Sequence, residues 1–258
     1  MNKRKISKNI LICVLSGLAY FLTTYPIRGL FQVFTISDVR PGCAIALASY
    51  ICFGPYAALG CAISNLIADI LTGQTLAVQL EGFPLQFLYG IVSYYLWKYL
   101  TKNDEHSYRI DSSIKYIKVT VVCFVYALVS SLGVGLIFYL NYVPNILDIT
   151  KFVFLNNFTF PMTLLFPILI LMNIIVSGSG KEKTRKLGLT EKIIISSSLL
   201  KFIGIFFIIV FTFNSGIIGD TYEMWNKVYI DSILFVNLLS ALTIIVTFIF
   251  DRRISKAK

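Results

Sequence analysis

Charged residues are scarce in this sequence. Asp, Glu, Lys and Arg make up 14% of its 258 residues, while 57% are hydrophobic. Ordinary soluble domains contain about 25% charged and roughly 45–50% apolar residues. The composition therefore excludes an ordinary soluble globular protein. The net charge of +10 does not indicate nucleic-acid binding, because nearly every basic residue lies between or outside long apolar runs.

Residues that bind metals or drive catalysis are also few. His106 is the sole histidine, and the five cysteines form no C-x-x-C pair, which excludes most zinc sites, histidine-based triads and disulfide frameworks. The glycines and lysines of residues 177–184 lack the spacing of a phosphate-binding loop. An intramembrane enzyme would need paired acids or a nucleophile with its base, and the sequence offers neither. We therefore predict no catalytic residue, no metal, no cofactor and no enzymatic activity.

Long apolar runs dominate what is present. A bilayer core of about 30 Å needs roughly 20 apolar residues per helix. Eight runs reach or approach this length, at residues 9–26, 42–53, 56–71, 83–99, 117–140, 152–176, 193–213 and 228–250. The second and third are short and are separated by Gly54 and Pro55, which leaves open that one of them is interfacial or tilted. We predict an all-α integral membrane protein with eight helices.

The basic residues predict the orientation of these helices. Eighteen of the 23 Lys and Arg residues lie in four segments, residues 3–8, 98–118, 181–192 and 252–258. Because cytoplasmic loops carry the excess of basic residues, we predict that both termini are inside, in a bacterial cytoplasmic membrane. No small-residue cleavage site follows the first run, so we expect it to remain as a helix.

Small residues recur at helical spacing on the second and third runs. The first stripe is Ala44, Ala48 and Cys52, and the second is Gly60, Ser64 and Ala68. Such stripes let helix backbones approach closely in lipid, and plain helix packing is a sufficient explanation for them.

Asp69 is an ionisable residue within an apolar run, which is costly in a membrane and usually marks a cavity or a partner. It lies 14 residues after Pro55, or about 21 Å along a helix axis, and Asn65 lies one turn deeper on the same face. Other polar residues are expected near the same outer level: Arg28, Gln32, Asp38, Arg40, Gln74, Gln79, Glu81, Gln86, Asn156 and Asn157. This convergence is typical of a solute pocket, although Asp69 could instead pair with Arg28 or Arg40.

Several of these features together resemble one family. They are the basic first helix, the loop ending in Arg40-Pro41, the hairpin closed by Phe53-Gly54-Pro55, and the continuation Gly60-x3-Ser64-Asn65-x3-Asp69. The pattern resembles the substrate-binding S components of energy-coupling factor (ECF) transporters over residues 9–176. The resemblance implies a six-helix solute-binding core without its own ATPase, which docks onto a transmembrane coupling subunit and two cytoplasmic ATPases.

The resemblance also implies roles for particular residues. Residues 29–39 would form a lid, and the substrate-binding residues would be Arg40, Asn65, Asp69, Gln86 and Asn156. The stripe Cys13-x3-Gly17 approximates the pattern with which the family docks. We accordingly divide the chain into a solute-binding core (residues 1–176), a basic linker (177–192) and a C-terminal two-helix hairpin (193–258) that six-helix S components do not need.

We expect the protein to be a membrane-embedded substrate-binding subunit for uptake of a vitamin-like or other small micronutrient. The alternative is a membrane sensor or assembly module without transport. The mixed charges near the outer face suit a zwitterion, a cation paired to Asp69 or a neutral heterocycle equally well. Lys201 lies in the seventh run, where we expect it to be structural, by pairing with Asp231, by extending toward the cytoplasm or by contacting a partner subunit.

Overall fold

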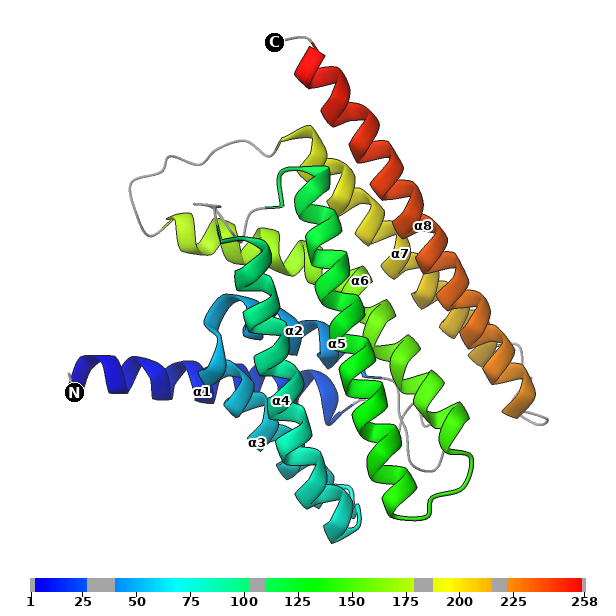
Figure 1. The fold of residues 1–258 in the computed structure, drawn as a ribbon. Helices are drawn as coiled ribbons and strands as arrows, with labels where there is room; N and C mark the ends of the chain where they lie inside the picture. Colours follow the sequence, from blue (N-terminus) through cyan, green and yellow to red (C-terminus); the bar gives the residue numbers. More distant parts are fainter. Residues whose placement is uncertain (1–2, 27–39, 103–109, 179–187, 215–221, 257–258) are drawn as a thin grey trace. The chain divides into compact units, whose positions relative to one another are not determined.

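The computed structural model of the chain describes residues 3–26, 40–102, 110–178, 188–214 and 222–256 (Figure 1). In these residues there are eight helices and no strand. The helices are α1 (Lys3–Thr24), α2 (Gly42–Phe53), α3 (Pro55–Leu71), α4 (Leu76–Leu100), α5 (Ser113–Leu140), α6 (Ile146–Gly178), α7 (Leu189–Asn214) and α8 (Tyr222–Lys256). Each of the eight apolar runs forms a helix, as predicted.

Several helices extend beyond their apolar run. Helix α4 begins at Leu76, seven residues before the predicted start, because the Thr75 side chain accepts a hydrogen bond from the Val78 amide (3.4 Å) and caps the helix. The helix then continues through Pro84. Apolar length therefore predicted where the helices lie, whereas the polar cap decided where this one begins.

Four helical segments of the described chain are long and apolar enough to cross a membrane: Ile6–Thr24, Ser113–Leu140, Ile146–Met172 and Leu234–Asp251. This is the pattern of a multi-pass membrane protein. Helices α2 and α3 are apolar but shorter. The crossing of all eight helices and the cytoplasmic placement of both termini stay predictions.

The chain divides into two compact units, which we call unit 1 and unit 2. Unit 1 comprises Met1–Asn103 and Val121–Pro161, and unit 2 comprises Asp104–Thr120 and Met162–Lys258. Helices α5 and α6 thus contribute residues to both units. The three-part functional division stays a prediction, because compactness does not test which residues bind a solute.

In unit 1, α3 packs against α1, α2 and α4. A Cβ atom on Gly60 would overlap the carbonyl oxygen of Cys13, and one on Gly17 would lie 2.7 Å from the Gly60 oxygen. The close backbone approach expected from the small-residue stripe of α3 is therefore confirmed, with α1 as the neighbour. Cys13 and Gly17 of α1 thus lie against α3 within unit 1, and docking through this stripe stays a prediction.

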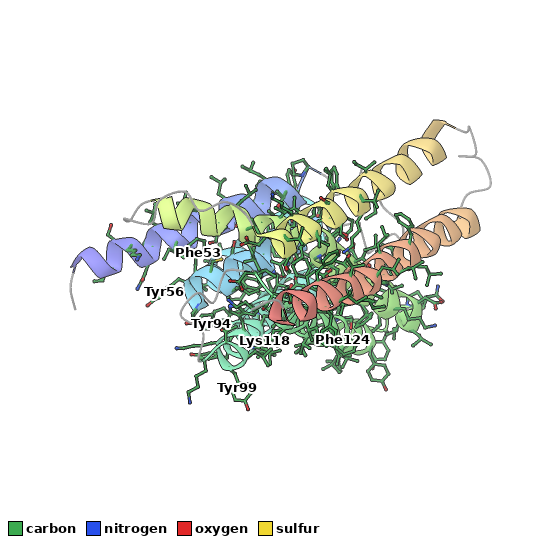
Figure 2. The ribbon with its side chains drawn as sticks, turned by 90° about the horizontal axis from the view of Figure 1, so that it is seen from above. Phe53, Tyr56, Tyr94, Tyr99, Lys118 and Phe124 are labelled. Carbon is green, nitrogen blue, oxygen red and sulfur yellow. The ribbon has the colours of Figure 1, made fainter. Side chains whose placement is uncertain are left out.

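The α2–α3 turn is the one predicted from Gly54 and Pro55. Gly54 has a φ of +70°, which favours glycine, and Pro55 is the first residue of α3. Figure 2 shows the side chains of Phe53, Tyr56 and Tyr94 close to this turn, and a Cβ on Gly54 would touch the Tyr94 ring at 3.0 Å. Aromatic side chains of this kind gather at membrane interfaces.

In unit 2, α7 and α8 lie side by side (Figure 1). Asp251 near the end of α8 accepts hydrogen bonds from the Ser113 amide (2.7 Å) and from the Thr190 hydroxyl (3.0 Å). One carboxylate therefore joins the beginnings of α5 and α7 to the end of α8. A negative charge is favourable there, because the first amides of a helix lack intrahelical acceptors.

Candidate solute-binding site

Unit 1 contains a cavity of about 50 Å³ whose described lining comes from five of its segments. Six of the lining side chains carry a hydroxyl, amide or guanidinium group: Tyr20, Arg40, Tyr89, Ser130, Asn156 and Asn157. The others are Cys43, Val134, Phe138 and Val153. Polar groups inside a bundle of apolar helices are costly unless they face a cavity or one another, so this cavity is the candidate site.

Arg40 and Asn156 are the two predicted site residues that line the cavity. The Arg40 backbone amide donates to the Asn156 Oδ1 atom (3.3 Å), and the Asn156 side chain is buried. This bond fixes the start of α2 against α6, although the two residues are 116 positions apart. Both residues are therefore held together at one wall of the cavity.

A second set of bonds holds the neighbouring wall. The Cys43 thiol donates to Asn157 Oδ1 (2.7 Å), and Asn157 Nδ2 donates to the Ser130 hydroxyl (2.8 Å). The Ser130 hydroxyl in turn donates to the Ala127 carbonyl oxygen (3.1 Å). The Asn157 amide is thus used at both ends to position α2, α5 and α6.

Asn65 and Asp69 do not line the cavity but connect to it. Asn65 Nδ2 donates to Asp69 Oδ2 (2.7 Å), and the Tyr20 hydroxyl, which belongs to the lining, donates to Asn65 Oδ1 (3.2 Å). Both residues are buried. In this arrangement they support the Tyr20 side chain, whereas direct contact between a solute and either of them stays a prediction.

Gln86 also lies behind the lining. Its Nε2 atom donates to the Tyr50 hydroxyl (2.8 Å). The Tyr50 ring packs on Tyr126, with centroids 6.4 Å apart, and Tyr126 meets the lining residue Tyr89 edge to face at 5.2 Å. Tyr50 and Tyr126 thus connect Gln86 to the lining residue Tyr89.

Four lining residues with polar groups were not predicted from the sequence as site residues: Tyr20, Cys43, Tyr89 and Ser130. Asn157 was among the polar residues expected near the outer face, but it was not chosen as a site residue. Two adjacent asparagines in an apolar helix are a signal that could have selected it. The tyrosines gave no comparable signal, because the chain has 15 of them.

Some predicted features lie outside the described residues. These are Arg28, Gln32, Asp38 and the expected lid at residues 29–39. The Glu81 carboxylate accepts from Asn141 Nδ2 (2.9 Å) and does not line the cavity. Across the described chain, no three His, Cys, Asp or Glu residues are grouped as they would be to hold a metal ion.

Lys201 of unit 2 is fully buried, with 0% of its surface exposed. Its Nζ atom donates to the Tyr116 hydroxyl and to the Met162 carbonyl oxygen, both at 3.4 Å, and the Tyr116 ring stacks on Phe166. The side chain therefore does not extend toward solvent, which was one of the expectations. The side chain of Asp231, its other expected partner, is outside the described residues.

No family model, no curated protein and no solved structure matches this chain.

Proposed function

We propose that the protein is a membrane-embedded substrate-binding subunit for uptake of a vitamin-like or other small micronutrient, energised by ATPases in partner proteins. The observation that carries this proposal is the cavity in unit 1, where Arg40, Asn156 and several hydroxyl groups meet among apolar helices. Ligand sites of this type combine mostly apolar walls with a few fixed polar groups. The proposal assigns no chemistry to the protein, only binding and release.

The cavity is small for a whole micronutrient. Roughly 10–15 Å³ of such space holds one water molecule, so about 50 Å³ suits a few waters or one functional group of a ligand. A solute carrier must close and open its site during transport, and a nearly closed site is compatible with that cycle. The body of a vitamin-sized solute would occupy space gained when the site opens.

The resemblance to ECF S components supports the assignment of a transmembrane coupling subunit and two ATPases as partners. The face of α1 that carries Cys13 and Gly17 is packed against α3. The opposite face of α1 exposes Ile10, Leu11, Val14, Leu18 and Leu22, which suits lipid or a membrane partner.

Two measurements together test the proposal. The first is thermal unfolding of the purified protein in nanodiscs with a panel of water-soluble vitamins, and the second is accumulation of the responding vitamin by cells that make the protein. We expect one compound to raise the unfolding temperature and to be accumulated, and we expect Asn156→Ala to lose both effects. Asn237→Ala, a substitution in unit 2, is the matched control and should keep both.

The outcomes separate the two hypotheses. Stabilisation without accumulation would favour the sensor or assembly module. A panel that gives neither stabilisation nor accumulation, with the protein properly inserted, would remove the uptake proposal.

A further inference from the structure

The wall that α5 supplies to the cavity lies on a weak stretch of helix. Ser130, Val134 and Phe138 line the cavity at intervals of four residues, so they share one face of α5. Gly133 and Gly135 flank Val134 in the helix interior. Glycine lowers the stability of a helix interior, because it loses more conformational freedom there than any other residue. This part of α5 therefore bends at a smaller cost in free energy than a stretch without glycine.

Leu85 of α4 fills the space that Gly133 leaves open. A Cβ atom at position 133 would overlap the Leu85 side chain, with the Cδ2 and Cγ atoms only 2.8 and 3.0 Å away. Pro84 precedes Leu85 inside α4, and a proline removes one hydrogen bond of the helix. Leu85 lies one turn from the lining residue Tyr89, and Gly133 is next to the lining residue Val134. The α4–α5 contact thus lies beside the cavity, where both helices are weakened.

The end of α5 is fastened to α4 by a hydrogen bond and is followed by a strained residue. The Glu81 carboxylate on α4 accepts from Nδ2 of Asn141 (2.9 Å), the first residue after α5. The next residue, Tyr142, has a φ of +54°, a left-handed conformation that is unfavourable for residues other than glycine. Its side chain is 95% exposed. Strained residues of this kind gather at switch regions and ligand clamps.

We infer that residues 133–142 form the gate of the cavity; this inference rests on the proposed function. In the closed state, which the structure describes, Leu85 is seated at Gly133. In the open state the gate bends away from α4 at its glycines, and Val134 and Phe138 leave the cavity wall. This movement supplies the space that the body of a solute needs, because the closed cavity of about 50 Å³ holds only a small group.

The Cys43 thiol can report the opening of the gate, because it belongs to the cavity lining and is buried. The full-length protein in nanodiscs is treated with N-ethylmaleimide, and the labelling rate of each cysteine is measured by peptide mass spectrometry. Cys123 of unit 1 is 0% exposed and is not among the described lining residues, so its labelling reports unfolding of the unit. We expect Cys43 to react several-fold faster than Cys123.

Three variants connect the labelling to the gate. Leu85→Ala removes the side chain that closes it and should raise the Cys43 rate about tenfold, and Gly133→Ala should do the same by displacing Leu85. Leu88→Ala is the matched control, because it makes the same change on α4 at a side chain that is 53% exposed, and it should keep the wild-type rate. Tyr142→Gly removes strain from the closed state and should slow the labelling several-fold. A general loss of stability would not produce this opposite effect.

The outcomes distinguish this inference from the proposed function. The gate inference is wrong if Leu85→Ala labels like Leu88→Ala, if Tyr142→Gly labels no more slowly than the wild type, or if Cys43 reacts only together with Cys123. Accumulation of a stabilising vitamin would then leave the uptake function standing. If the labelling rates change as expected but no vitamin stabilises the protein or is accumulated, the gate stands and the uptake function fails.

Discussion

The polar side chains of the two units lie in different surroundings. In unit 1, Arg40, Asn156 and Tyr89 line a cavity. In unit 2, Lys201 bonds to Tyr116 and to a backbone carbonyl within a fully buried environment. A polar residue in an apolar helix therefore does not mark a solute site by itself. A site is indicated where polar groups from several segments of the chain meet an open space.

A substitution in the contact between α1 and α3 should give the largest loss of stability in unit 1 without changing a contact of unit 2. Gly60→Ala places a methyl group on the Cys13 carbonyl, and we expect a loss of about 3 kcal/mol or more in the free energy of unfolding, at the upper end of overpacking effects. Gly82→Ala is the matched control, because its Cβ would meet only Asp69 Oδ2 at 3.8 Å. Unfolding curves in detergent measure both variants, and equal stability of the two would contradict the close approach.

Arg40 in unit 1 and the buried Lys201 in unit 2 sharpen the comparison of the units. Because we place Arg40 in the solute site and Lys201 in a structural cluster, Arg40→Met should weaken solute binding by about 10-fold to 100-fold, as expected for lost bonds to a charged group. Lys201→Met keeps much of the side-chain volume and should leave solute affinity unchanged, although stability can shift. Titrations of each variant with the stabilising solute measure this, and a loss of affinity in Lys201→Met would remove the functional difference between the units.

A substitution of Asp251 tests the hydrogen bonds that join α5, α7 and α8 in unit 2. Asp251→Ala removes the acceptor for the Ser113 amide and the Thr190 hydroxyl, and we expect the free energy of unfolding to fall by about 2 kcal/mol. Asp148→Ala removes a carboxylate that forms an exposed ion pair with Lys151 and should change stability by less than about 1 kcal/mol. Denaturant unfolding measures both variants. A similar loss of stability in the two would show that the hydrogen bonds of Asp251 stabilise the protein no more than an exposed ion pair does.

Cys43 gives the smallest expected effect. Cys43→Ala leaves Asn157 Oδ1 without its donor and should lower the free energy of unfolding by about 1 kcal/mol. Cys43→Ser retains a donor and should lose about half as much or less. Thermal unfolding of the two variants measures the difference, and an alanine variant as stable as the wild type would mean that the thiol is only a small apolar group there.

The sequence was sufficient to predict the positions of all eight helices, because long apolar runs and the Gly54-Pro55 break are local signals. It also placed Arg40 and Asn156 among the site candidates, since polar residues in apolar surroundings are conspicuous. It could not separate lining residues from supporting ones. Asn65 and Gln86 differ from Asn156 only in their neighbours, namely Tyr20 and Tyr50, and such neighbours come from distant parts of the chain.

The role of the Cys43 thiol could not be predicted from the sequence either. A cysteine in an apolar helix usually behaves as a small hydrophobe, and nothing in the local sequence indicates otherwise. Its hydrogen bond depends on Asn157, which is 114 positions away. The helical scaffold could therefore be predicted from local composition, whereas the pairing of its polar groups required the tertiary structure.

Helix α2 has 12 residues, which gives it a length of about 18 Å, far less than the roughly 30 Å of a bilayer core. Nine of its 12 residues are buried, so acyl chains have little access to it. Membrane thickness acts through hydrophobic mismatch at lipid-exposed surfaces. A thicker or thinner bilayer should therefore tilt the long helices with exposed apolar side chains first. The part of the cavity wall that α2 supplies should respond less to the lipid composition of the cell.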